Sequence, residues 1–122
     1  MMQTSNAVPA EANLTTELLQ RARSEPDAIA IVSAQRSIDY RMLDALVWGC
    51  AQWLSDRGIR PGTVVALTIL DPLTQAVALL AVARLGATCL PLPASSGSQE
   101  RHALASRAGA AWFATDRPER FD

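Results

Sequence analysis

Residues 63–70 read TVVALTIL, and this run decides the fold of the chain. The run is almost entirely apolar and does not alternate with polar residues, which is typical of a strand buried on both faces at the centre of a parallel sheet. Asp71 follows as a helix cap, and Pro72 takes the first helical position, where its missing N–H costs nothing. The pattern predicts a strand that leads directly into a helix ending at Gly86.

A second strand, a helix and a third strand follow in the sequence. Residues 87–92 (ATCLPL) form a short strand, in which Pro91 indicates a strand end or a sheet edge. A helix capped by Ser96 or Ser98 then runs to about residue 108, and residues 110–115 (AAWFAT) form a third apolar strand. Strands that alternate with helices predict an α/β fold, with three parallel strands in βα units covered by helices.

The region before residue 63 adds a hairpin and two helices. Residues 28–32 (AIAIV) and 37–39 (SID) are short strand-forming runs joined by a turn, so they predict an N-terminal β-hairpin. A short helix over residues 14–23 precedes the hairpin, and a long helix follows it from about residue 40 to residue 57. We expect a flexible tail over residues 1–13, a domain over residues 14–116 and a tail over residues 117–122.

The long helix has an apolar stripe at helical spacing, and Gly58 provides its end. Trp48 falls off this stripe and is the best candidate for a surface that another part of the protein covers. The side chains expected to face the core are Leu43, Leu46, Val47, Cys50, Trp53 and Leu54.

Composition excludes several functions. All eleven basic residues are Arg, so chemistry that needs a lysine ammonium is excluded for this chain by itself. The formal net charge is −1 without a basic stripe, so we do not expect nucleic-acid binding. Cys50, Cys89 and His102 are too few and too scattered for a zinc site. We expect buried, reduced thiols and a solvated surface histidine.

The chain has neither a secretion signal nor a membrane span in its sequence pattern. The N-terminus lacks a basic start followed by an apolar run, and Asp71-Pro72 interrupts the most apolar region, residues 64–85. We therefore expect a cytoplasmic protein that does not enter a membrane.

Five segments, in order, resemble the N-terminal portion of AMP-forming acyl-activating enzymes, a family that includes acyl-CoA synthetases, peptide-synthetase adenylation domains and luciferases. The resemblance covers nearly the whole chain, and the segment with Gly86, Ala87, Pro91 and Leu92 after a helix is the most specific. The segments are residues 26–32 (PDAIAIV), 37–43 (SIDYRML), 53–66 (WLSDRGIRPGTVVA), 84–92 (RLGATCLPL) and 108–116 (AGAAWFATD).

The resemblance implies an ATP-dependent enzyme that joins AMP to a carboxylate and then passes the acyl group to a thiol, often that of coenzyme A. Such chemistry needs a Gly/Ser/Thr-rich phosphate loop, an acid for Mg²⁺ or the ribose, and a Lys that stabilises the transferring charge. The only small-residue loop here is residues 94–98 (ASSGS), with one Gly and no Lys, and the family's phosphate loop lies later in the sequence. We therefore assign no catalytic, cofactor-binding or metal-binding residue, and interpret Asp71 as a helix cap.

Two hypotheses remain. In the first, the chain is the N-terminal fragment of a carboxylate-activating ligase, inactive alone; its partner is the remainder of the enzyme, and its exposed apolar surface makes it self-associate. In the second, it is a non-catalytic α/β binding or regulatory module derived from that family. The second draws on the missing Lys and on departures from the family pattern at Met42 and Pro93. Arg84, where the family often has Lys, also departs from that pattern.

Overall fold

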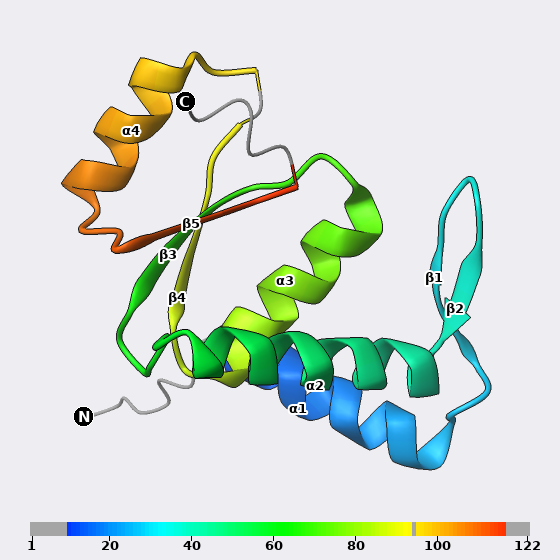
Figure 1. The fold of residues 1–122 in the computed structure, drawn as a ribbon. Helices are drawn as coiled ribbons and strands as arrows, with labels where there is room; N and C mark the ends of the chain where they lie inside the picture. The colour runs from blue at the N-terminus through cyan, green and yellow to red at the C-terminus, as the bar shows by residue number, and fades with distance from the viewer. Residues whose placement is uncertain (1–9, 94, 117–122) are drawn as a thin grey trace, which may run out of the picture.

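The computed structural model describes residues 10–93 and 95–116 of the chain. Helices and strands alternate through most of its length (Figure 1). In chain order the elements are α1 (Ala10–Ser24), β1 (Ile29–Val32), β2 (Ser37–Asp39), α2 (Tyr40–Asp56), β3 (Val64–Thr68), α3 (Pro72–Arg84), β4 (Thr88–Pro91), α4 (Ser98–Arg107) and β5 (Trp112–Thr115).

The predicted parallel sheet is confirmed. Its three strands have the order β4-β3-β5, and both pairings are parallel. β3 is the central strand, and Val65, Ala66 and Leu67 in it are at most 2% exposed. The unbroken apolar run therefore identified the one strand that has a neighbour on each side. Pro91 lies in the edge strand β4, also as predicted.

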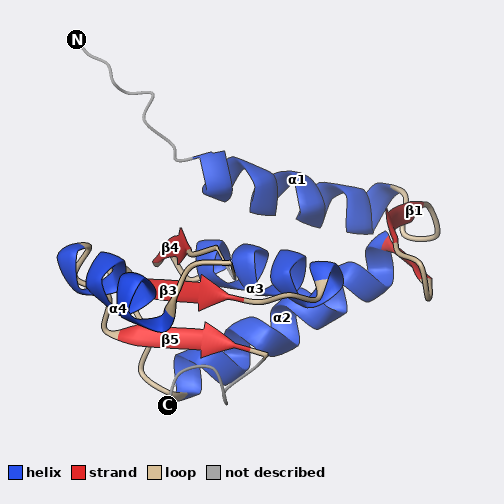
Figure 2. Ribbon diagram, turned by 90° about the horizontal axis from the view of Figure 1, so that it is seen from above, coloured by secondary structure: helices blue, strands red, loops and turns tan. Residues whose placement is uncertain are grey.

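Helices cover both faces of this sheet. Val65 and Leu67 belong to the larger core cluster, together with buried side chains of α2 and α3. Ala66 points to the other face, where it packs with Ala105 of α4 and with Leu92. Figure 2 shows the parallel strands lying between α4 and the helices α2 and α3.

The predicted hairpin is also confirmed, as a separate sheet of two antiparallel strands. Ser33 closes its turn, because the Ser33 amide and hydroxyl both donate to the carbonyl oxygen of Arg36 at 2.8 Å. Figure 1 places the hairpin beyond the first turn of α2, at the end of that helix away from the parallel sheet.

Two helix beginnings differ from the prediction. Helix α1 begins at Ala10 rather than Leu14, because residues 10–13 (AEAN) contain neither Gly nor Pro and include two alanines, the best helix former. The cap of α4 is Gly97, not Ser96 or Ser98. Gly97 has the extended backbone of a cap residue and Ser98 is already helical, so the carbonyl of Gly97 accepts the first helical bond, from the Arg101 amide at 3.0 Å.

The predicted apolar stripe of α2 is wrong at two positions. Leu46 is 36% exposed and Trp53 is 54% exposed, whereas Ala51, outside the stripe, is buried. Ala51 joins Ala78 and Ala81 of α3 in the core, and small side chains let two helices approach closely. The position of α3 therefore decides which face of α2 is buried, and Trp53 lies outside that contact.

Some predictions fall outside the described residues. These are the tails over residues 1–9 and 117–122 and the contribution of Ala94 to the small-residue loop. Within the described ranges, none of the helices combines the length and the apolar character needed to cross a lipid bilayer.

Candidate functional site

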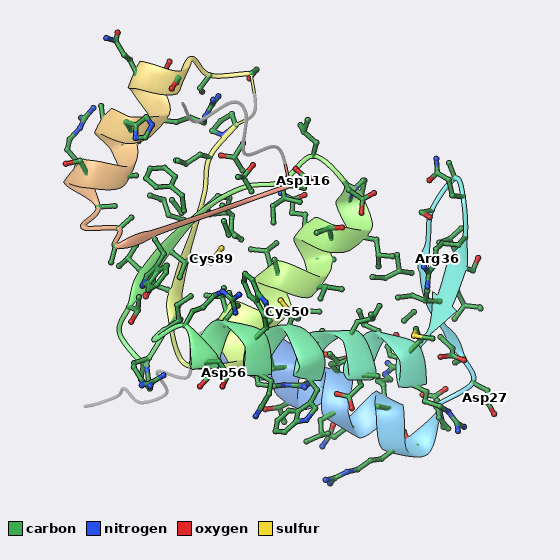
Figure 3. The ribbon with its side chains drawn as sticks, in the orientation of Figure 1. Asp27, Arg36, Cys50, Asp56, Cys89 and Asp116 are labelled. Atoms are coloured by element: carbon green, nitrogen blue, oxygen red, sulfur yellow. The ribbon has the colours of Figure 1, made fainter. Side chains whose placement is uncertain are left out.

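The carboxyl ends of β3 and β5 meet at one edge of the sheet, where ligands of open α/β sheets commonly bind. Asp116 follows β5 directly, and its carboxylate accepts hydrogen bonds from the backbone of the β3–α3 connection. The Leu70 amide lies 3.1 Å from Oδ1 and 3.2 Å from Oδ2, and the Asp71 amide lies 3.0 Å from Oδ2. Figure 3 shows Asp116 beside the turn that enters α3. This carboxylate ties the end of β5 to the start of α3.

Asp71 is the cap of α3, as predicted. Its Oδ2 accepts from the Thr74 amide at 2.9 Å and from the Thr74 hydroxyl at 2.6 Å. The Thr74 hydroxyl bond, followed by the Thr74 amide bond, lowers the pKa of Asp71, although the charge of Asp116 opposes this effect. Two carboxylates of the protein therefore occupy amides at the start of α3 that would otherwise attract an anion.

An apolar cavity of about 400 Å³ opens beside this edge, between α2 and the face of the sheet at β5. We call it the β5 groove. Its walls are mostly aliphatic and aromatic, and polar groups of Thr74, Thr115 and Asp116 lie in its lining. Residues in its lining include Trp53 and Leu54 of α2, Arg57 just after α2, Val65 and Leu67 of β3, Ala78 of α3, and Trp112 and Ala114 of β5.

Two tryptophans stand on the walls of the β5 groove. Trp53 is covered on one ring face by Arg57, whose Cζ lies 3.4 Å from the ring centre, a cation–π contact. Trp112 is 37% exposed and lies close to Gly58, just beyond the end of α2. Neither ring is fully packed by the described residues, so the groove has an aromatic wall accessible to another apolar chain.

The small-residue loop before α4 is held by a buried arginine. Arg101 is only 4% exposed, and its Nη1 donates to the carbonyl oxygen of Ser96. The sequence analysis does not predict the burial of Arg101. The signal was available, because Arg101 lies one turn after Gly97, on the face of α4 that also carries Ala105.

The remaining residues singled out from the sequence lie apart from one another. His102 is exposed, as predicted, and its ring centre lies 5.0 Å from that of Phe113. Neither Cys50 nor Cys89 is in a disulfide, both are only half-buried, and burial raises the pKa of the Cys50 thiol. Trp48 is 60% exposed, in agreement with its place off the stripe.

Arg84, which departs from the Lys of the family pattern, has a structural partner. Its guanidinium lies 3.0 Å from Oδ1 of Asp44, and the two side chains are 16% and 28% exposed. This ion pair joins α3 to α2 in the neighbourhood of Trp48, away from the β5 groove.

The described residues do not fit ATP or Mg²⁺. The carboxylates of Asp71 and Asp116 are both engaged by backbone amides, and the chain has no Lys. Across residues 10–93 and 95–116, no three His, Cys, Asp or Glu side chains gather as metal ligands would. What this region offers is an apolar groove and a strand edge.

Comparison with known proteins finds one matching family model, sequence relatives and similar solved structures. The family model for the AMP-binding enzyme matches residues 18–121. The anguibactin system regulator of Vibrio anguillarum is 33% identical over 101 residues, which are 79% of this chain and 10% of that protein. The N-terminal subdomain of NpsA from Klebsiella oxytoca, solved in complex with anthranilyl-AMSN, superposes with a TM-score of 0.81 at 26% identity.

That superposition covers 91% of this chain and 28% of the NpsA subdomain. The inhibitor-bound N-terminal domain of FACL13 from Mycobacterium tuberculosis gives a TM-score of 0.79 at 27% identity, over 84% of this chain and 26% of that one. The chain thus spans about a tenth of the regulator and little more than a quarter of each solved structure.

Proposed function

Because the chain belongs to the AMP-binding enzyme family, we propose that it forms the first part of the N-terminal subdomain of an ATP-dependent, AMP-forming ligase that activates a carboxylate. The observation that carries the proposal is the superposition, which accounts for nearly all of this chain but for only 28% of a solved adenylation subdomain. The chain contributes a folded parallel sheet with its helices, and the reacting groups belong to the remainder of the enzyme.

In this proposal the chain is inactive on its own. The complete enzyme would bind ATP and Mg²⁺ and, where it resembles an acyl-CoA synthetase, coenzyme A. Transfer of the adenylyl group needs preorganised positive charge around the phosphates. The described residues supply a sheet edge closed by Asp71 and Asp116, whose negative charges repel phosphate. We place the enzyme in the cytoplasm, where ATP and coenzyme A are available.

The isolated chain tests this proposal in an exchange assay. Mixed with ATP, Mg²⁺, labelled pyrophosphate and a panel of carboxylic acids, it is expected to give no exchange above a heat-denatured sample. The NpsA adenylation protein with an anthranilate substrate provides the positive control. Exchange by this chain above that background would contradict the proposal, because the chain would then carry a complete site of its own.

A second candidate function is a non-catalytic binding or regulatory module derived from the family. The observation in its favour is that Arg84, at the position of the family's Lys, is used in an ion pair with Asp44. Sequencing the reading frame beyond Asp122 separates the two functions. A Ser/Thr/Gly-rich loop ending in Lys-Gly supports the ligase, whereas a stop codon at that point supports the module.

The proposed partner is the remainder of the adenylating enzyme. Without it, we expect the chain to self-associate, because Trp53, Trp112 and Phe113 are 54%, 37% and 38% exposed. Sedimentation velocity at increasing concentration measures this, and a single monomer at all concentrations would contradict it.

A further inference from the structure

Helix α2 has an exposed face with charge only at its two ends. Figure 1 draws this helix in front of α1 and α3. Its buried side chains, from Leu43 to Leu54, face α3 and the core. We call the opposite side the outer face of α2. The residues that form it, all exposed, are Arg41, Ala45, Trp48, Gly49, Gln52 and Asp56. The two middle turns of this face therefore present an uncharged surface around Trp48, which is 60% exposed.

Gly49 has no role in the packing of the described chain. It lies in the interior of a helix, where glycine is less favourable than alanine. Its φ is not positive, so the backbone does not require glycine at this position. A Cβ built on Gly49 would meet none of the described residues within 4 Å, so no neighbour in this part of the chain uses the space. The missing side chain leaves room for a group that approaches the outer face from outside.

The outer face is symmetric about the midpoint between residues 48 and 49. Each of the three residues before this point has a counterpart equally far beyond it. Two antiparallel copies of α2, related by a twofold axis through the midpoint, bring such counterparts together, because a twofold interface uses the same patch on both subunits. The pairs between copies are Arg41 with Asp56 and Ala45 with Gln52, while Trp48 and Gly49 each meet their own equivalent near the axis.

The charges at the two ends are complementary only in this direction. Arg41 and Asp56 are about 22 Å apart along the helix, at a rise of about 1.5 Å per residue. Figure 3 places Asp56 at the end of α2 away from the hairpin. An antiparallel pair sets Arg41 of each copy against Asp56 of the other, whereas a parallel pair would set like charges together. Arg41 also pairs with Asp27 at 3.2 Å, but both side chains are mostly exposed and a guanidinium has donors for a second carboxylate.

We propose that the outer face of α2 binds a second copy of this chain, so that two α2 helices pair antiparallel about a twofold axis between residues 48 and 49. The Gly49 backbones approach closely on one side of the axis, and the two Trp48 rings pack together on the other. The Arg41–Asp56 pairs at both ends fix the direction and the register. The inference does not depend on the proposed ligase activity, and the surface is separate from the β5 groove.

Charge reversal tests the direction of pairing in sedimentation equilibrium. Arg41→Asp and Asp56→Arg each place like charges together at both ends, so each is expected to raise the dissociation constant of the dimer at least about tenfold. An equimolar mixture of the two variants restores it to within about threefold of the parent, because every end then pairs an aspartate with an arginine. Both substitutions suit the helix dipole, so both variants are expected to fold.

The double variant Arg41→Asp, Asp56→Arg controls for net charge. It has the net charge of the parent and complementary ends, so its dissociation constant is expected to stay within about threefold of the parent value. Arg107→Asp is the matched single reversal. Arg107 is an exposed arginine in the last turn of α4, on the other face of the sheet, and its reversal is expected to leave the dimer unchanged.

Substitutions at the axis test the close approach. Gly49→Leu is expected to raise the dissociation constant at least about tenfold, because the two leucines occupy the space between the backbones. Leucine favours a helix over glycine, so the unfolding temperature of the monomer is expected to stay the same or rise. Trp48→Ala is expected to weaken the dimer at least about tenfold through loss of the ring pair. Trp112→Ala, in the β5 groove, is expected to reduce larger assemblies but to leave the dimer.

Four results would overturn the proposal. The parent chain is monomeric at every concentration, or Gly49→Leu and Trp48→Ala leave its dimer intact. The mixture of the two charge-reversal variants associates no better than either variant alone, or Trp112→Ala abolishes the dimer, which would make the β5 groove the interface.

Discussion

Asp116 provides the most informative single perturbation of the fold. Its carboxylate is held between the end of β5 and the β3–α3 connection, where it accepts from the Leu70 and Asp71 amides at 3.0 to 3.2 Å. Asp116→Ala removes both bonds and a negative charge near the positive end of α3. Asp116→Asn removes the charge and replaces one carboxylate oxygen by an amide nitrogen, while an oxygen at the position of Oδ2 can still accept from both amides. The two substitutions therefore separate hydrogen bonding from electrostatics.

The expected cost follows from these contacts. A hydrogen bond to a charged group contributes about 1.5–3 kcal/mol, but these amides are near the surface, where water replaces part of each bond, so we take about 1 kcal/mol for each. Asp116→Ala is then expected to lower the free energy of unfolding by about 2 kcal/mol and Asp116→Asn by about 1 kcal/mol. For a domain of this size, 2 kcal/mol corresponds to a fall of about 8 °C in the unfolding temperature.

Urea and thermal unfolding followed by circular dichroism measure both changes. Asp56→Ala is the control, because Asp56 is an exposed aspartate at the end of α2 whose removal is expected to leave stability unchanged or slightly raised. If Asp116→Ala unfolds within 0.5 kcal/mol, a margin of about twofold in the unfolding equilibrium, of the parent and of Asp56→Ala, then Asp116 does not tie β5 to α3 and the reasoning fails.

Three further predictions concern the helix cap, the interhelical ion pair and a turn. Since folding lowers the pKa of Asp71, the stability that its carboxylate provides is present above the ordinary pKa of 3.8 and is lost as the pH falls through the lowered pKa. In unfolding temperatures measured against pH, Asp71→Asn is expected to reduce the decrease at acid pH. A double-mutant cycle on Asp44→Asn and Arg84→Gln is expected to give a coupling of about 1 kcal/mol in urea unfolding, and additive effects would contradict the ion pair. Gly86→Ala is expected to cost about 1–2 kcal/mol in the same assay, because Gly86 has φ 74°, and an unchanged midpoint would argue against that backbone.

Local signals in the sequence were sufficient for the sheet. The run of residues 63–70 predicts a central strand, and Asp71-Pro72 predicts the beginning of α3, because cap and proline preferences depend on neighbouring residues alone. Pro91 identifies the edge position of β4 for the same reason. These are the features for which prediction and structure agree closely.

Features that depend on distant contacts were missed. Asp116 acquires its role only when β5 and the β3–α3 connection come together, at a separation of 46 residues. Ala51 is buried and Trp53 is exposed, the reverse of the predicted stripe. The reason is that the buried face of α2 is the one that packs against α3, which lies later in the chain. The burial of Arg101 likewise depends on how α4 packs against the sheet.

The sequence also indicates which chemistry to look for elsewhere. Without a Lys, this chain cannot supply the ammonium that the family's transfer step implies, and the structure engages both carboxylates at the sheet edge with backbone amides.

Titration calorimetry with anthranilyl-AMSN tests the central claim most directly. Three samples are compared: the NpsA N-terminal subdomain, a chimera that carries this chain in place of the matching segment, and the isolated chain. The account predicts that the subdomain and the folded chimera bind the compound and that the isolated chain does not. Binding by the isolated chain with the affinity of the subdomain, or a folded chimera that does not bind, would contradict it.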